Sequence, residues 1–387
     1  MKICNFRPLC VLALIVIFTV ATCLTSLWLT MAFGLLLTAA LYLAALPSHF
    51  KITTAVVFAL TVVSFLLTTW LVPNPYYHTF DPDAGLRGVI LHYADWYLHK
   101  FLSADNAALL YGVLFGDKSG LPFILRSNFT IVGLGHMLAV SGLHVGLLAG
   151  VLTWLLKTCR VPRRAHLWVI TPILLFYAYL CGWQYSILRA VIMFFVYMFV
   201  KENFGLADPL SCLSCAAIVI LVLFPYALVS ASFLLSFACV LGIDLMYDFF
   251  LKHCYVKAVA LYLSVTIASF PFVLYFFKSV PLYGLLANVV LVPLLIFCFY
   301  VGMFAVSTFI MGAVLWVAEP LLTMVRSVSN AISKLPFATV AATGSVPAII
   351  VYLVALILLS RFIFLPRKVK YPLAVALFAC YFVLIMV

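Results

Sequence analysis

The stretch GLGHMLAVSGLHVGLLAG, residues 133–150, places two imidazoles and one hydroxyl, those of His136, His144 and Ser141, in an otherwise apolar run. Such groups can bind a metal ion, transfer protons or attack a carbonyl carbon. A run this apolar is expected to cross a membrane, where a histidine needs a polar partner or a water-filled cavity. Four interpretations follow: a catalytic serine, a metal site, a pore lining, or tight helix packing.

The spacing argues against a metal site and leaves a Ser–His pair open. On a continuous helix, His136 and His144 would lie about 12 Å apart, too far to share one ion. Ser141 and His144 would be neighbours on one face, although a membrane serine commonly bonds back to a carbonyl of its own helix. AVSG also resembles the GxSG element of rhomboid-like intramembrane serine proteases, with Ala139 in place of the first glycine. That alternative needs a histidine from a different helix, and none lies centrally in another predicted span.

The glycines of this stretch have a simpler explanation. Gly142, Gly146 and Gly150 recur every four residues, so they would share one helix face and let another helix approach closely. Gly133 and Gly135 precede this repeat and are expected to loosen the first turn. Helix packing therefore explains the glycines without any chemistry.

The composition predicts an all-α, polytopic membrane protein. Of the 387 residues, 67% are hydrophobic and 8% are charged, and the mean hydropathy is +1.28. A soluble domain of this size would need far more surface charge. We expect about 11–13 transmembrane helices, each long enough to cross about 30 Å of hydrocarbon. They are predicted near residues 9–29, 31–46, 52–72, 134–156, 167–182, 186–200, 207–224, 228–247, 258–277, 284–305, 307–325, 346–363 and 371–387.

The distribution of Lys and Arg predicts the orientation of these spans. Alternating them from a cytoplasmic N-terminus puts most of the 22 Lys and Arg residues inside, which is the positive-inside pattern. The net charge of +12 is therefore not evidence for an external nucleic-acid surface. The first apolar run, 9–29, is expected to be a membrane anchor and not a cleaved signal peptide.

The chain is expected to have four parts. In the second of them, residues 73–130, the apolar residues Ile90, Tyr93, Tyr97 and Phe101 recur at helical spacing. This amphipathic pattern is typical of a helix lying at the membrane surface. The parts are a three-helix membrane block (1–72), an outer-facing linker with amphipathic interfacial helices (73–130), a transmembrane core (131–310) and C-terminal transmembrane helices (311–387).

Arg189 is the one basic residue placed well inside a predicted span. Burying its charge is costly unless the guanidinium is paired or hydrated. Asp244 and Glu319 are candidate partners, which would make it half of a structural ion pair. In a wet passage the guanidinium would instead contact a phosphate.

Other polar residues and prolines suggest a pathway through the spans. Gln184 and Asn288 could line one cavity with His136, Ser141, His144 and Arg189. Pro271 and Pro293 are expected to act as hinges, because interrupted helices occur in membranes where backbone faces protein or water.

No metal or other cofactor is expected. The 11 cysteines lie mostly inside predicted spans and form no CxxC pair. GDKSG, which contains Gly116, Asp117, Lys118 and Gly120, is predicted to be a polar turn. It is not a P-loop, since the GxxxxGK[ST] spacing is absent. Energy for transport would then come from a partner or from the membrane potential.

Two motifs in order closely resemble the ComEC family of inner-membrane DNA channel proteins. LLYGVLFGDKSGLP and GLGHMLAVSGLHVG are similar to that family's LLxGLLxGDRSGLP and GLxHLLAISGLHVG. GWQYSILRAVIM resembles its G-x-S-x-x-RA-x-x-M element, and SFLLSFACVLGI resembles SFQLSFxAVxGI with Leu234 in place of glutamine. Pro271, Asn288 and Pro293 stand at recurring positions of a later element. The resemblance covers residues 105–310.

The resemblance implies a transport core, not an enzyme, that passes single-stranded DNA through the bacterial plasma (inner) membrane during natural transformation. Residues 73–88 leave no room for that family's OB-type domain, and no HxHxDH cluster is present for a metallo-β-lactamase domain. The expected partners are single-stranded DNA, the lipid bilayer and separate nuclease, DNA-receptor or motor proteins, with a homo-oligomer left open. The alternative is a permease for a smaller solute, which the sparse polar faces of the spans favour.

Overall fold

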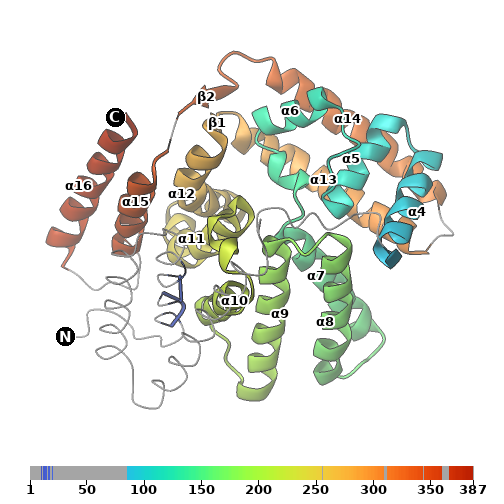
Figure 1. Cartoon of the computed structure of the whole chain (residues 1–387), viewed down its shortest axis with the longest axis horizontal. Coiled ribbons are helices and arrows are strands. Elements are labelled where there is room, and N and C mark those ends of the chain that lie inside the picture. Colours follow the sequence, from blue (N-terminus) through green and yellow to red (C-terminus); the bar gives the residue numbers. More distant parts are fainter. Residues whose placement is uncertain are drawn as a thin grey trace, which may run out of the picture.

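The computed structural model describes residues 85–254, 256–308, 312–342, 344–359 and 366–386, together with residues 10, 12–14, 16–17 and 20. The predicted spans 31–46 and 52–72, most of 9–29, and the stretch 73–84 lie outside these residues. The described chain is an assembly of helices with one small two-stranded sheet (Figure 1). The predicted all-α membrane fold is confirmed.

Three helices within the described residues are long and apolar enough to cross a membrane. They are α11 (Ala231–Cys254), α12 (Lys257–Phe277) and α13 (Gly284–Thr308), and they coincide with predicted spans 228–247, 258–277 and 284–305. Several further helices are apolar but shorter. The total of 11–13 spans therefore stays a prediction.

One group of helices packs against α13 (Figure 1). In this group α4 (Gly85–Phe101), α5 (Ala104–Phe115) and α14 (Leu315–Ser333) contact α13 directly, and α6 (Phe123–Ile131) packs against α14. Its core contains Leu110 of α5, Phe299 of α13 and Leu322 of α14, all essentially inaccessible to solvent. A Cβ at Gly302 would lie 3.1 Å from the Leu110 side chain, so the missing side chain lets α5 and α13 approach closely.

The next elements in the chain are η1 (Gly135–Leu138), α7 (Gly142–Thr158), α8 (Arg163–Leu180), α9 (Tyr185–Phe204) and α10 (Pro209–Leu223). Gly182 and Trp183, with φ of 75° and 54°, reverse the chain between α8 and α9, and glycine adopts the first of these conformations without strain. Asp208 caps α10 by accepting the Ser211 N–H at 2.9 Å.

The remaining elements lie around α11 and α12. They are η2 (Pro225–Val229), α15 (Val346–Leu359), α16 (Arg367–Met386), β1 (Ser279–Pro281) and β2 (Thr339–Ala341). The short η3 (Gly312–Val314) lies instead beside α4, α13 and α14. The two strands are antiparallel, with Ser279 opposite Ala341 and Pro281 opposite Thr339. A Cβ at Gly242 would lie 2.5 Å from the carbonyl oxygen of Ser264. Glycine is therefore what allows α11 and α12 to pack so closely.

Two predicted spans are wrong. Span 134–156 is not one helix, because η1 ends at Leu138 and α7 begins at Gly142. Span 307–325 crosses a boundary, since α13 continues to Thr308 and a separate helix, α14, begins at Leu315. The apolar residues Leu315, Ala318, Leu322 and Val325 of α14 are buried in the protein, which a hydropathy pattern cannot distinguish from burial in lipid.

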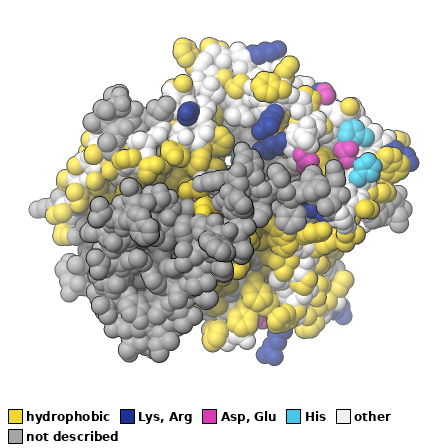
Figure 2. Space-filling model, viewed as in Figure 1, with side chains coloured by type: hydrophobic (Ala, Val, Ile, Leu, Met, Phe, Trp, Pro, Cys, Tyr) yellow, Lys and Arg dark blue, Asp and Glu magenta, His cyan; other side chains and the backbone are white. Residues whose placement is uncertain are grey.

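The surface is largely apolar, as expected for a protein surrounded by lipid. Figure 2 shows hydrophobic side chains spread over the described part of one face, with few basic side chains between them. Trp154 on α7 and Trp168 on α8 are both more than 60% exposed. Apolar exposure on this scale would favour aggregation in water, whereas a bilayer covers it.

Candidate functional site

Three interrupted chain segments meet at one place, here called the polar junction. They are Gly116 at the end of α5, residues 139–141 before α7, and Gln184 at the start of α9. A Cβ at Gly116 would lie 2.8 Å from Nε2 of Gln184 and 3.0 Å from Cγ2 of Val140. Ser186 Oγ donates to the Val140 carbonyl oxygen at 2.9 Å. Gly116 also has a φ of 78°, so both its conformation and its surroundings require glycine.

Contacts from α8 hold the junction in position. The Tyr177 hydroxyl donates to the carbonyl oxygen of Leu114, near the end of α5, at 2.7 Å. Arg87 of α4 donates from Nε to the Leu180 carbonyl oxygen at 3.0 Å. A cation at the last turn of α8 is favourable because the helix dipole is negative there. The ends of α5 and α8 are thereby held side by side.

Ser141 and His144 form the N-terminal cap of α7. Ser141 Oγ accepts the Leu143 N–H at 3.2 Å, and Nδ1 of His144 accepts the Ser141 N–H at 3.2 Å. This is a capping box in which histidine takes the place usual for Glu or Gln. Nδ1 is also 3.2 Å from Ser141 Oγ. Since Nδ1 accepts a backbone N–H, we assign the proton of the neutral ring to Nε2.

The His144 ring is buried against α13. Its side chain is inaccessible to solvent, and the ring packs edge-on against Phe299 with 4.9 Å between centroids. Nε2 has no hydrogen-bond partner in the part of the chain that the structure describes. His136 is exposed instead, with Nδ1 lying 3.1 Å from the Gly133 carbonyl oxygen. The described residues contain no group of three His, Cys, Asp or Glu that could hold a metal ion.

Arg189 lies in the second turn of α9, and its side chain is only 6% exposed. Nε donates to Ser236 Oγ of α11 at 2.8 Å, Nη1 donates to the Met193 sulfur at 3.3 Å, and the guanidinium carbon lies 5.9 Å from the Phe237 ring centroid. No carboxylate of the described chain forms an ion pair with it. Neither candidate partner, Asp244 or Glu319, is therefore its counter-charge.

The guanidinium of Arg189 lies directly against the first residue of α7. A Cβ built on Gly142 would collide with Nη2 of Arg189 and would lie 3.5 Å from the Ala190 Cβ. The N-terminus of a helix carries a partial positive charge, so two positive groups face each other here. By contrast, nothing lies within 4 Å of a Cβ at Gly146 or Gly150 among the described residues, so the close approach occurs at Gly142.

The structure does not bring Asn288 and the two hinge prolines into the polar junction. Asn288 Nδ2 donates to the Gly284 carbonyl oxygen of its own helix at 2.6 Å. Pro271 is buried inside α12, and Pro293 is exposed inside α13. Their part in a pathway stays a prediction.

The GDKSG segment forms a turn at the edge of the junction. Asp117 Oδ1 accepts the Ser119 N–H at 2.8 Å, which is an Asx turn, and Gly120 lies beside Ala108. Lys118 is half-buried. Burial, and secondarily the nearby charge of Arg126, lowers the pKa of the Lys118 ammonium group below its ordinary value.

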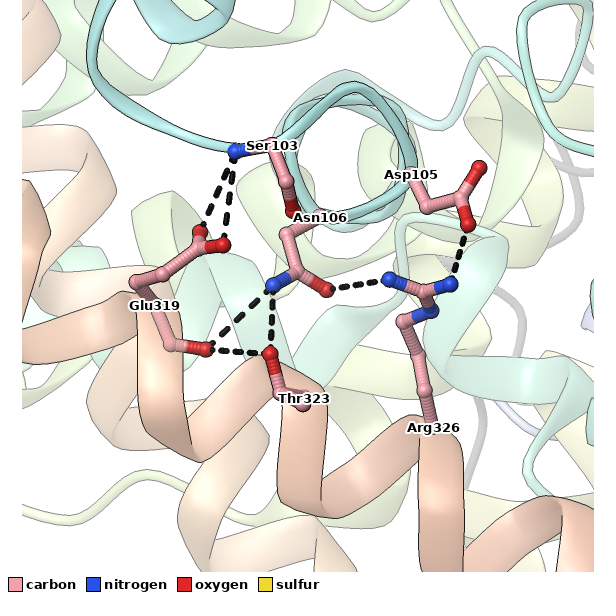
Figure 3. Close-up of polar contacts among 6 residues, drawn as sticks. All are labelled: Ser103, Asp105, Asn106, Glu319, Thr323 and Arg326. Carbon is pink, nitrogen blue, oxygen red and sulfur yellow. Dashed lines mark hydrogen bonds and ion pairs between the residues drawn. The ribbon is translucent and has the colours of Figure 1, made fainter.

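A second polar cluster, here called the α5–α14 network, was not predicted. Asn106 is inaccessible to solvent and donates to Thr323 Oγ1 at 2.8 Å. Arg326 donates from Nη1 to Asn106 Oδ1 at 3.0 Å and pairs through Nη2 with Asp105. The carboxylate of Glu319 accepts the Ser103 N–H at 3.3 and 3.4 Å (Figure 3).

The sequence does contain a signal for the α5–α14 network. Glu319, Thr323 and Arg326 are spaced i, i+4, i+7, so they share one helix face. The predicted span 307–325 hid this pattern because it ended before Arg326. Ser103 does not cap α5 with its side chain, but its N–H bonds to the Glu319 carboxylate, which ties the start of α5 to α14.

A family model and two named relatives indicate the same family. The family model described as "Competence protein" matches residues 113–385. Of the relatives, "ComE operon protein 3" of Bacillus subtilis (strain 168) is 28% identical over 53% of this chain and 27% of its own length. "Competence protein ComA" of Neisseria gonorrhoeae is 35% identical over 23% of this chain and 14% of its own length. "Uncharacterized protein YcaI" of Escherichia coli (strain K12) is 25% identical over 56% of this chain and 30% of its own length.

The chain therefore corresponds to less than a third of each of these relatives. No solved structure matches it significantly.

Proposed function

This chain belongs to the competence protein family, and on that premise we propose that its helical core passes single-stranded DNA across the bacterial plasma (inner) membrane during natural transformation, with the N-terminus in the cytoplasm. Membership of the family supports a role in competence and DNA uptake generally. The finer statement, that this chain conducts the strand, is the proposal. The short coverage of the longer relatives means that their complete activity does not transfer to this chain without a test.

The observation that carries the proposal is the polar junction itself. At membrane depth, non-helical backbone occurs where it is enclosed by protein or lines water, and transporters place their substrates at such interruptions. Here the ends of α5, α7 and α9 meet around Gln184, Ser141 and Arg189. This is the arrangement that a charged, hydrated strand would need in an apolar bundle.

Residues would take different roles in this pathway. Arg189 would contact the strand, because every nucleotide carries a phosphate. Gln184, with its side chain at Gly116, could bind bases or sugars as the strand passes. Separate nuclease, DNA-receptor and motor proteins would prepare and pull the strand.

The test is import of labelled DNA into cells that carry this chain, a deletion strain, or single variants at equal membrane abundance. We expect Arg189→Ala to lower cytoplasmic DNA at least about tenfold, since a charge-assisted hydrogen bond contributes roughly 1.5–3 kcal/mol. Arg164→Ala is the matched control, because Arg164 is an exposed arginine at the start of α8. Normal import by the deletion strain would overturn the proposal and favour a permease for a smaller solute.

A further inference from the structure

The start of α7 and the neighbouring Arg189 present two hydrogen-bond donors that have no acceptor among the described residues. The N–H groups of Leu143 and Val145 bond to Ser141. The His144 N–H bonds to the Ser141 side chain as part of the capping box, so within the described residues the Gly142 N–H is the donor of this turn that has no acceptor. Nη2 of Arg189 also has none there, because the guanidinium bonds through Nε and Nη1 alone. Arg189 Nη2 lies against Gly142, so these donors belong to one place.

One of these donors carries a full positive charge and the other a partial one, and no carboxylate of the described residues pairs with them. The first-turn N–H groups carry the positive end of the helix dipole, and the guanidinium carries a full charge in a side chain that is 6% exposed. Leaving such a charge buried without a counter-ion is costly. A bound anion would remove both the repulsion and the unsatisfied donors.

We propose that the Gly142 N–H at the start of α7 and the guanidinium of Arg189 together bind one phosphodiester of a nucleic-acid strand. Backbone N–H groups at a helix N-terminus are a general site for phosphate, and the flat guanidinium suits two phosphate oxygens. Gly142 is required because any side chain there would occupy the space of the guanidinium. This inference rests on the proposed function for the identity of the strand, but the anion site can be tested without it.

The experiment uses the full chain purified in a phosphate-free maltoside detergent. Dimethyl phosphate, a phosphodiester without bases or lipid, is added, and its ³¹P resonance is recorded for line broadening by the protein. We expect the wild-type chain to broaden the signal and Arg189→Gln to abolish the effect. Gly142→Ala should weaken it strongly, since the new methyl group displaces Nη2 while the charge is retained. Gly146→Ala is the matched control, because a Cβ there meets nothing within 4 Å in the described chain.

Competition identifies the source of the phosphodiester. Displacement of dimethyl phosphate by a short oligo(dT), but not by a short-chain phosphatidylglycerol, supports the nucleic-acid assignment. Displacement by the lipid alone overturns that assignment. Absence of broadening by folded wild-type protein, with its thermal transition intact, overturns the site itself.

The same variants separate this inference from the proposed function. Loss of DNA import in the Arg189 variant, together with an absence of anion binding by the wild-type chain, would remove the site and keep the function. Anion binding that depends on Arg189 and Gly142, together with normal import in a deletion strain, would keep the anion site while overturning both DNA conduction and the assignment to a nucleic-acid strand.

Discussion

Arg326 is partly buried and Arg189 is fully buried, and the two arginines differ in the acceptors that surround them. In the α5–α14 network, Arg326 has a carboxylate, Asp105, and an amide oxygen, Asn106, as acceptors. At the polar junction, Arg189 has a hydroxyl and a thioether sulfur, and no carboxylate from the described chain. A satisfied arginine holds helices together, whereas one without a counter-charge is available to an anion from outside the protein.

The two histidines of the opening motif differ in a comparable way. His144 is fully buried and completes the cap of α7, whereas His136 is exposed and contacts the Gly133 carbonyl group. The Ser141–His144 pair is thus explained by helix capping. A serine protease would need its histidine on another helix, and here both residues belong to one helix terminus.

The largest expected change in stability is at the α5–α14 network. Arg326→Ala removes the partner of Asp105 and leaves the amide oxygen of buried Asn106 without this donor. We expect a loss of about 1–3 kcal/mol in the free energy of unfolding, discounted because the Asp105 side chain is 46% exposed. Denaturant unfolding of the purified chain measures this change. Arg189→Ala serves as the contrasting variant and should be less destabilising, and the opposite order would contradict the comparison.

A carboxylate placed beside Arg189 should pair with its charge, as Asp105 pairs with Arg326. Ser236→Asp places a carboxylate at the position where Ser236 Oγ now accepts the Arg189 Nε–H. We expect DNA import to fall about tenfold, equivalent to ~1.4 kcal/mol, while the free energy of unfolding does not decrease. Ser236→Ala, which removes the hydroxyl without adding charge, is the control. Equal import by Ser236→Asp and wild type would mean that the free charge of Arg189 is not used.

Two substitutions at His144 distinguish a role in capping α7 from a role in the transport pathway. Gln is a usual residue at this position of a capping box, so His144→Gln should retain the unfolding free energy of the wild type. His144→Leu should lose about 1 kcal/mol, the usual value of an N-terminal cap. Import is measured on the same variants. A normal stability with lost import in His144→Gln would show a further role for the imidazole.

The sequence predicts the all-α membrane fold and the three long spans, because composition and apolar run length determine these features, and two ordered motifs carry the resemblance to the family. It does not predict the interruption before Gly142. A hydropathy window of about 19 residues averages out the three-residue interruption at residues 139–141, whereas the capping box of Ser141 and His144 acts locally and sets the start of α7. The same averaging explains why the predicted span 307–325 includes both the end of α13 and the start of α14.

The candidate site is only partly readable from the sequence. Arg189, Ser141 and His144 can be selected because polar groups are rare in an apolar run. Their arrangement depends on tertiary contacts such as that of Gly142 with Arg189, which are 47 positions apart in the chain. Asn106 was missed because a single buried amide has no periodic signal, and its partners lie on α14.

The smallest expected effect concerns Lys118, a half-buried cation outside the membrane-spanning helices whose neighbour is another cation, Arg126. Burial first, and the charge of Arg126 second, lower the pKa of its ammonium group, so Lys118 should lose its proton at a lower pH than a free lysine side chain. Acetylation by an amine-reactive ester, followed by mass spectrometry across alkaline pH, should therefore show a profile shifted to lower pH relative to N-acetyl-lysine amide. Arg126→Gln removes only the smaller cause, so its profile should move part of the way back. A profile that does not move in this variant would mean that the two cations do not interact, and that Lys118 responds to burial alone.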